Sequence, residues 1–169
     1  MESSRERAAT YDISDVDYLR HGTTDYQARV YRPRGAGPFP AIVDVHGGAW
    51  TVGDRMQCEP IQRVLASNGI VVFSLDFRLP SAAVYPGPVA DINYGIRYFK
   101  ANAERFGTRA DLVGAFGSSS GGHQLLLNVL RPADPRYTAI PLAGLKASIR
   151  ASRLRSSAGR SAIHTHATG

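Results

Sequence analysis

Two segments near the start of the chain, Val16–Leu19 and Gln27–Tyr31, roughly alternate apolar and polar residues. Alternation with a period of two is typical of a strand that buries one face. The turn-like residues 21–25 (His-Gly-Thr-Thr-Asp) separate the segments, so the pattern predicts an antiparallel hairpin. Residues 1–10 are polar, and we expect them to be frayed and flexible.

From Ala41 onward, short apolar runs alternate with segments whose apolar residues have helical spacing. The runs predict strands, and the spaced segments predict helices. That order favours an α/β fold, a mostly parallel sheet with helices on both faces. The predicted strands are 41–45, 70–77 and 112–116, and the predicted helices are 56–67, 89–106 and 124–130.

Composition limits the class of protein. The 169 residues suffice for one domain, and 43% hydrophobic with 20% charged residues is typical of a globular protein. No apolar run approaches the ~20 residues of a membrane span, and no apolar segment follows the charged N-terminus as in a signal peptide. Cys58 is the only cysteine, which excludes an internal disulfide and fits a reducing compartment. We therefore expect a cytoplasmic protein without a membrane partner.

The net charge of +6 is unevenly distributed along the chain. Residues 146–169 contain no acidic residue, and their basic residues are Lys146, Arg150, Arg153, Arg155 and Arg160. The preceding part of the chain is nearly neutral, and no aromatic residue lies among these arginines to stack on bases. The sequence therefore argues against a nucleic-acid partner.

The most informative stretch is 117–123, Gly-Ser-Ser-Ser-Gly-Gly-His, between a predicted strand and a predicted helix. Strand, Gly-x-Ser-x-Gly and helix form the pattern of a nucleophile elbow, which places a serine on a sharp, strained turn. Residues two positions before and after that serine must be nearly free of side chain. Only Ser119 meets this condition, with Gly117 and Gly121, and is the candidate nucleophile. A flexible or phosphate-binding turn is the alternative interpretation of the motif alone.

A second glycine-rich segment, His46-Gly-Gly-Ala-Trp50, directly follows the predicted strand 41–45. Acyl transfer builds negative charge on a carbonyl oxygen, and backbone N–H groups aimed at that oxygen stabilise the charge. Consecutive small residues let the main chain approach a ligand closely. Alone, the segment is better explained by a plain strand-to-loop turn, in which His46 bonds its own loop. Combined with the serine elbow, it favours catalysis.

Four motifs together resemble α/β-hydrolases of the hormone-sensitive-lipase and carboxylesterase kind, including their feruloyl-esterase-like and kynurenine-formamidase-like relatives. The motifs are His46-Gly-Gly-Ala-Trp50, Leu75-Asp-Phe-Arg-Leu79, Tyr85-Pro-Gly-Pro-Val-Ala-Asp91 and Gly117-Ser-Ser-Ser-Gly-Gly-His123. The resemblance covers roughly residues 12–135. It implies the N-terminal half of a serine hydrolase that acts on small-molecule esters.

The resemblance also assigns roles to individual residues. It implies an oxyanion hole formed by the N–H groups of Gly48, Ala49 and Ser120. It implies supporting positions at His46, Gly47, Gly117 and Gly121. Ala49 replaces the usual third glycine, as in formamidase-like members. Bracing of the sheet and of a helix start is implied for the Asp76/Arg78 pair and for Asp91, and Trp50 either lines the substrate pocket or packs in the core.

The triad acid and base have no matching residue in the sequence. A serine needs a histidine to remove its proton and an acid to orient that histidine, and in this fold both follow the serine. Asp134 lies too close to the elbow, and His123 belongs to the following helix. His164 and His166 follow no strand pattern. We expect a catalytically incomplete chain, truncated after about five or six of the family's eight or so strands, with an open sheet edge and poor stability.

The expected domain spans 11–145, and 146–169 is expected to be a disordered basic tail. Its composition is also what a GC-rich gene yields out of frame, so a frameshifted or truncated hydrolase stands beside a naturally short protein. Carboxylesterase, arylformamidase or peptidase, and non-catalytic binding module all stay open, because fold and elbow do not fix the acyl group. No metal cluster, Walker-type loop or dinucleotide fingerprint occurs in the sequence, so no cofactor is implied. Oligomeric state and substrate specificity stay open as well.

Overall fold

The computed structural model describes residues 9–142; residues 1–8 and the expected tail lie outside that range. The strands are β1 (Tyr11–His21), β2 (Thr24–Pro33), β3 (Ala41–Val45), β4 (Val71–Leu75) and β5 (Val113–Gly117). The helices are α1 (Glu59–Ser67), α2 (Gly87–Ala101) and α3 (Ser119–Leu130), with short 3-10 turns η1 (Ala103–Phe106) and η2 (Ala110–Leu112). In the described range, no helix has both the length and the apolar character to cross a membrane.

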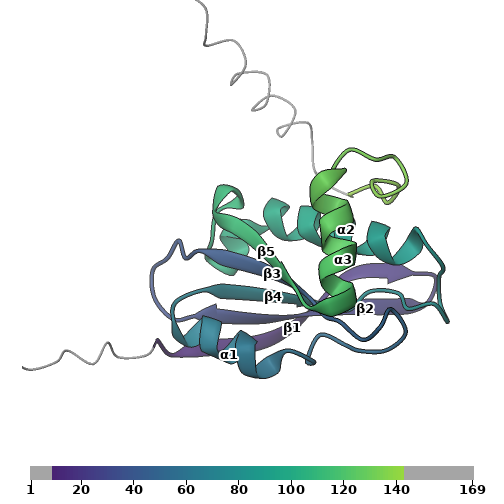
Figure 1. Ribbon diagram of the computed structural model, residues 1–169. Coiled ribbons are helices and arrows are strands. Elements are labelled where there is room, and N and C mark those ends of the chain that lie inside the picture. Colours follow the sequence, from purple (N-terminus) through teal and green to yellow (C-terminus); the bar gives the residue numbers. More distant parts are fainter. Residues whose placement is uncertain (1–8, 143–169) are drawn as a thin grey trace, which may run out of the picture.

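The strands form one sheet in the order β1-β2-β4-β3-β5 (Figure 1). β1 and β2 form the predicted antiparallel hairpin, and β2 also runs antiparallel to β4. β4, β3 and β5 run parallel, because a helical crossover connects each to the next in sequence. The predicted strand–helix alternation and parallel pairing are confirmed from Ala41 onward, and the complete sheet is mixed.

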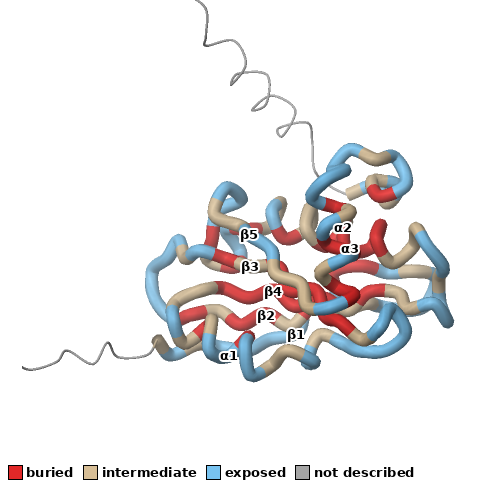
Figure 2. The backbone as a smooth tube through the Cα atoms, in the orientation of Figure 1, coloured by how far each residue is buried: buried red, intermediate tan, exposed pale blue. Residues whose placement is uncertain are grey.

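β4 shows why the sheet is covered on both faces. Phe73 and Leu75 lie in the main core, where the Phe73 ring stacks on that of Phe99 from α2 at 4.5 Å between centroids. Val72 points to the opposite face and packs with Ala66 of α1. Figure 1 shows α1 on one side of the sheet and α2 and α3 on the other. Figure 2 shows burial concentrated in the central strands, as expected for strands without a solvent face.

The ends of several elements differ from the predicted ones. Ala9 and Thr10, expected to be frayed, are tied to the fold: the Ala9 N–H donates to Ser67 O at 2.7 Å, and Thr10 O accepts from Arg34 N at 2.8 Å. The helix predicted over 89–106 is interrupted after α2, and a separate 3-10 turn completes the span. These shifts leave the order of elements unchanged.

β5 is an open edge of the sheet, because within residues 9–142 it pairs with β3 alone. A groove of about 720 Å³ lies beside β5, between α2 and α3. On α3, Leu126, Val129 and Leu130 are 54%, 61% and 70% exposed. An open edge flanked by an exposed apolar helix face matches the arrangement expected for a sheet that ends early.

Candidate active site

The two glycine-rich motifs leave the sheet side by side. β3 and β5 pair in parallel with Val45 opposite Gly117, so each motif begins at the same edge of the sheet. The Ser118 N–H donates to Val45 O at 3.3 Å, which continues the contact beyond the strands. Topology thus brings together two segments that are far apart in the sequence.

Ser119, the first residue of α3, has a backbone φ of +48°. The preceding Ser118 is extended, with φ −96° and ψ 141°, so the chain turns sharply between strand and helix. A left-handed backbone costs a residue with a side chain about 1–2 kcal/mol. The strained turn that the Gly-x-Ser-x-Gly spacing predicts is therefore centred on Ser119, whose side chain is exposed at the surface.

Gly121 permits this turn because α3 starts directly against the end of β3. A Cβ at Gly121 would lie 2.2 Å from the carbonyl oxygens of both Val45 and His46. The Gly117 side of the turn is also tight, although less so, since a Cβ there would lie 2.9 Å from the Gly121 carbonyl carbon. Any larger residue at position 121 must displace the main chain, so both glycines of the motif have a steric reason.

The His46–Trp50 loop touches the elbow through Gly47. A Cβ at Gly47 would lie 3.2 Å from the Cβ of Ser119 and 3.0 Å from Ser118 O. The loop then turns tightly, with φ values of +109° at Gly48, +52° at Ala49 and +63° at Trp50. Ala49 therefore holds a backbone conformation that glycine adopts more easily, at the position where the resembling family usually has glycine.

The N–H groups of Gly48, Ala49 and Ser120 make no backbone hydrogen bond to any of residues 9–142, and the same holds for those of Gly47, Trp50 and Ser119. Ser120 has none because the first N–H groups of a helix lack intrahelical acceptors. The next two, of Gly121 and Gly122, donate to Ser118 O at 2.8 and 3.3 Å. The three groups assigned to the oxyanion hole are thus open for another acceptor.

His46 supports this loop from the inside. Its side chain is buried, stacks on Phe77 with 4.3 Å between ring centroids, and donates from Nδ1 to Gly47 O at 2.8 Å. A Cβ at Gly53 would lie only 2.5 Å from the same nitrogen, so the returning arm of the loop packs on the ring. His46 therefore bonds its own loop, one of the two roles that the sequence left open.

An apolar pocket of about 280 Å³ lies beside the loop and the elbow helix. Its lining includes Trp50, Phe77, Pro80, Tyr85, His123 and Leu127. Trp50 is 52% exposed, and its ring meets that of His123 edge to face at 5.8 Å. Trp50 thus lines a pocket and does not pack in the core.

The BD-FAE family profile matches residues 29–139, more than half of the chain. The chain belongs to the BD-FAE family. Residues 9–142 form part of an α/β-hydrolase fold.

The curated relatives of this BD-FAE chain are much longer. The probable carboxylic ester hydrolase LipM of Mycobacterium tuberculosis is 31% identical over 134 residues, which cover 79% of this chain and 31% of LipM. Esterase LipC of the same organism is 34% identical over 103 residues, 60% of this chain and 26% of LipC. The chain thus spans between a quarter and a third of these relatives' length.

Solved esterases share the fold. The structure described as bacterial heroin esterase superposes with a TM-score of 0.66 at 26% identity, covering 77% of this chain and 41% of that one. Esterase Est2 of Thermogutta terrifontis gives a TM-score of 0.62 at 27% identity, covering 72% and 44%. The BD-FAE chain therefore corresponds to less than half of each of these folds.

The residues expected to brace this BD-FAE fold do so, with partners that the sequence did not reveal. Asp91 is fully buried. Its carboxylate accepts hydrogen bonds from Arg78 Nη2 at 2.7 Å and Nε at 2.8 Å, and it lies 2.8 Å from His21 Nε2. It thereby joins the end of β1 to the segment after β4. Asp76 does not pair with Arg78, as the resemblance implies, but with Arg55, at 2.6 Å. Asp76 and Arg78 are two apart in sequence, but each binds a different segment.

Within residues 9–142, no side-chain hydrogen bond joins Ser119 to a histidine or to a carboxylate. Asp134 binds Arg136 at 2.7 Å, which lowers the pKa of its carboxyl to about 2 and commits it to the turn after α3. Of the histidines in this range, His21 binds Asp91, His46 binds its own loop and His123 meets Trp50. His164 and His166 lie outside the described residues. No group of three metal-ligating side chains occurs in the described part either.

Proposed function

We propose that this chain carries the nucleophile and the oxyanion hole of a serine hydrolase that cleaves small carboxylic esters. The carrying observation is the strained φ of +48° at Ser119, directly beside the loop of Gly47. The esterases to which the chain is similar support ester cleavage over other acyl transfers.

In the proposed reaction, Ser119 Oγ bonds to the ester carbonyl carbon, and the carbonyl π electrons move onto oxygen. The N–H groups of Gly48, Ala49 and Ser120 donate to that oxyanion, which stabilises the tetrahedral intermediate. Its collapse breaks the bond to the alkoxide, which leaves as the alcohol, and water then hydrolyses the acyl-serine. The pocket beside Trp50 receives one of the two ester substituents.

The Ser119 proton needs a base, and two of the three histidines among residues 9–142 are bonded elsewhere, His21 to Asp91 and His46 to its own loop. We therefore propose that the chain as written is catalytically incomplete. A fluorophosphonate probe should leave the full chain unlabelled, because unassisted serine is a weak nucleophile. Labelling that maps to Ser119 would contradict the incompleteness but support the nucleophile, and labelling of another serine would contradict the nucleophile.

A cysteine variant tests the oxyanion hole without the missing base. In a Cys58→Ala background, Ser119→Cys forms a thiolate at raised pH by itself. Its acylation by p-nitrophenyl acetate creates an oxyanion, whereas its alkylation by iodoacetamide does not. The acylation-to-alkylation rate ratio should exceed that of the control Ser118→Cys by at least about tenfold, since one oxyanion donor contributes about 10²–10³. Equal ratios would contradict the proposal.

Arylformamidase or peptidase activity would use the same N–H groups, because the fold does not fix the acyl group. The lining of the pocket favours no one of these over the others. A binding module without catalysis is the remaining alternative. It would show equal ratios in the cysteine test together with saturable binding of an ester analogue.

A further inference from the structure

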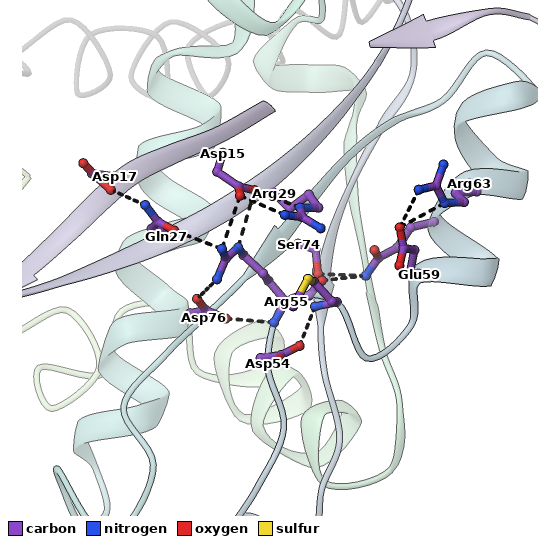
Figure 3. Close-up of polar contacts among 12 residues, drawn as sticks. Asp15, Asp17, Gln27, Arg29, Asp54, Arg55, Glu59, Arg63, Ser74 and Asp76 are labelled. Atoms are coloured by element: carbon purple, nitrogen blue, oxygen red, sulfur yellow. Dashed lines mark hydrogen bonds and ion pairs between the residues drawn. The ribbon is translucent and has the colours of Figure 1, made fainter. Parts of the chain in front are cut away.

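The loop that begins with His46–Trp50 continues to Arg55, which is the centre of a polar cluster (Figure 3). Its Nη1 donates to Asp76 Oδ2 at 2.6 Å, and its Nη2 donates to Gln27 Oε1 at 2.9 Å and to Asp15 Oδ2 at 3.2 Å. These acceptors come from β1, from β2 and from the residue after β4. One side chain of the loop is therefore bonded to three segments of the sheet.

The main chain of Arg55 is fixed as well. Its N–H donates to Asp76 Oδ1 at 2.8 Å, and its carbonyl accepts from Gln62 Nε2 at 3.0 Å. Gln62 is buried on α1 and also donates to Asp44 Oδ2 of β3 at 2.6 Å. Side chain, N–H and carbonyl of a single residue are thus all held by the sheet and by α1.

This anchor lies close to the groups proposed to bind the oxyanion. Gly53, two residues before Arg55, lies close to His46 and Gly47: a Cβ added to it would be 2.5 Å from His46 Nδ1 and 2.9 Å from Gly47 O. Between these points the loop contains the positive φ values of Ala49 and Trp50. Strained backbone of this kind persists only where the surroundings fix it. The loop is fixed by β3 at its start, and Arg55 is where it is fixed again at its end.

We propose that Arg55 is a positioning residue, whose bonds to Asp15, Gln27 and Asp76 hold the loop so that the Gly48 and Ala49 N–H groups face the elbow. The catalytic consequence rests on the proposed function, but the positioning of the loop does not. Arg55 and its acidic partners are partly exposed, and exposed ion pairs contribute little to overall stability. The effect of removing Arg55 should therefore be local to the loop.

The chain contains its own reporter for this effect. Trp50 is the single tryptophan, lies in the loop, and contacts the His123 ring. Loosening the loop separates the two rings and exposes the indole, which changes the tryptophan emission and its quenching by acrylamide. Arg29→Ala is a matched control, because Arg29 binds the same Asp15 at 2.9 Å but lies on β2, away from the loop.

We expect Arg55→Ala to raise the acrylamide quenching constant of the half-exposed Trp50 measurably above the wild-type value in the full chain, while the far-UV circular dichroism stays unchanged. Arg55→Lys, which has one nitrogen for three acceptors, should give a smaller rise. Arg29→Ala should match the wild type. An unchanged constant in Arg55→Ala, or an equal rise in Arg29→Ala, would overturn the proposal. If Arg55→Ala loses its far-UV signal, Arg55→Lys decides by the same criterion.

Acylation of Ser119→Cys separates this proposal from the proposed function. If the oxyanion hole operates, adding Arg55→Ala should lower the acylation-to-alkylation ratio about tenfold or more, and adding Arg29→Ala should not. If Ser119→Cys shows no preference for acylation while Trp50 responds to Arg55→Ala, the oxyanion hole is refuted and the positioning of the loop stands. A functioning oxyanion hole with no response of Trp50 or of the ratio to Arg55→Ala refutes the positioning alone.

Discussion

Gly121 lies so close to His46 that a Cβ on the glycine would be 2.2 Å from the histidine carbonyl oxygen. This contact joins the first turn of α3 to the end of β3. Neither partner is the flexible end of a side chain, so the clash with a methyl group has no local remedy.

We therefore expect Gly121→Ala to lower the free energy of unfolding by about 3 kcal/mol, at the upper end of the overpacking range. Gly114→Ala is the control, because its added Cβ would have its nearest neighbour, Ala41 O, at 3.8 Å and should change stability by less than about 0.5 kcal/mol. Urea denaturation followed by circular dichroism measures both. Equal stability of the two variants would show that the turn can shift.

The strain at Ser119 gives the opposite prediction. Ser119→Gly should raise the free energy of unfolding by about 0.5–1 kcal/mol, because glycine adopts a φ of +48° without steric cost. Ser118→Gly, at an ordinary φ of −96°, should lower it by a similar amount through the entropy of the unfolded chain. If both variants lose stability equally, the strained turn is not a property of the chain in solution.

Asp44 predicts a fall in stability as the pH rises. Burial raises the pKa of this carboxyl above its ordinary value of 3.8, although bonds from Gln62 and Ser74 oppose the shift. The folded state therefore holds the proton more tightly than the unfolded state, and this contribution declines from about pH 4 upward through the folded pKa. Asp44→Asn should flatten that decline in denaturant titrations across pH 4–8. An unchanged slope would mean that Asp44 folds ionised.

Asp15 predicts a loss of stability in acid. The hydrogen bond from Arg29, assisted by Arg55, lowers the pKa of its carboxyl from 3.8 to about 2. This contribution is complete above the unfolded pKa and disappears as the pH falls toward 2. Because the carboxylate is partly exposed, Asp15→Asn should cost less than about 1 kcal/mol at neutral pH and reduce the acid-side slope. If Asp15→Asn were as stable as the wild type at pH 7 but less stable at pH 2, the prediction that Asp15 stabilises the fold at neutral pH and not in acid would be wrong.

The open edge at β5 and the exposed apolar face of α3 beside it predict self-association of the chain. Replacing Leu126 and Val129 on α3 by glutamine should lower the mass measured by sedimentation at a fixed concentration. Ile61→Gln with Val64→Gln is the control, since these side chains are 48% and 61% exposed on α1, on the opposite face of the sheet. A monomer in every case would contradict the prediction.

The sequence predicts the positions of the elbow and of the His46–Trp50 loop better than it predicts the side chains that hold them. Elbow and loop are local motifs, each a few residues long, and the strand–helix alternation suffices to bring them to one edge of the sheet. The leucine-rich run predicts the helix after the elbow from residue 124. The helix starts earlier, at Ser119, and includes Gly121 and Gly122, because the small Gly121 lets the first turn of α3 lie directly against the end of β3.

The cluster around Arg55 has no sequence signal of its own. Asp15, Gln27 and Asp76 are separated by 40, 28 and 21 residues from Arg55, without periodicity that would relate them. Such partners follow from the strand order of the completed sheet, in particular from β2 pairing with β4. The pairing of Asp91 with both Arg78 and His21 was hidden for the same reason.

The register of β3 against β5 has a consequence for redesign of this protein. Val45 opposite Gly117 means that both motifs start at one rung of the ladder. Deleting one residue from either strand would shift one motif by a rung and turn its side chains to the other face of the sheet. The motifs are therefore a single transferable unit: a scaffold that accepts them must take the paired strands together with the loop as far as Arg55, because Gly53 packs against His46 and Arg55 is bonded to the sheet.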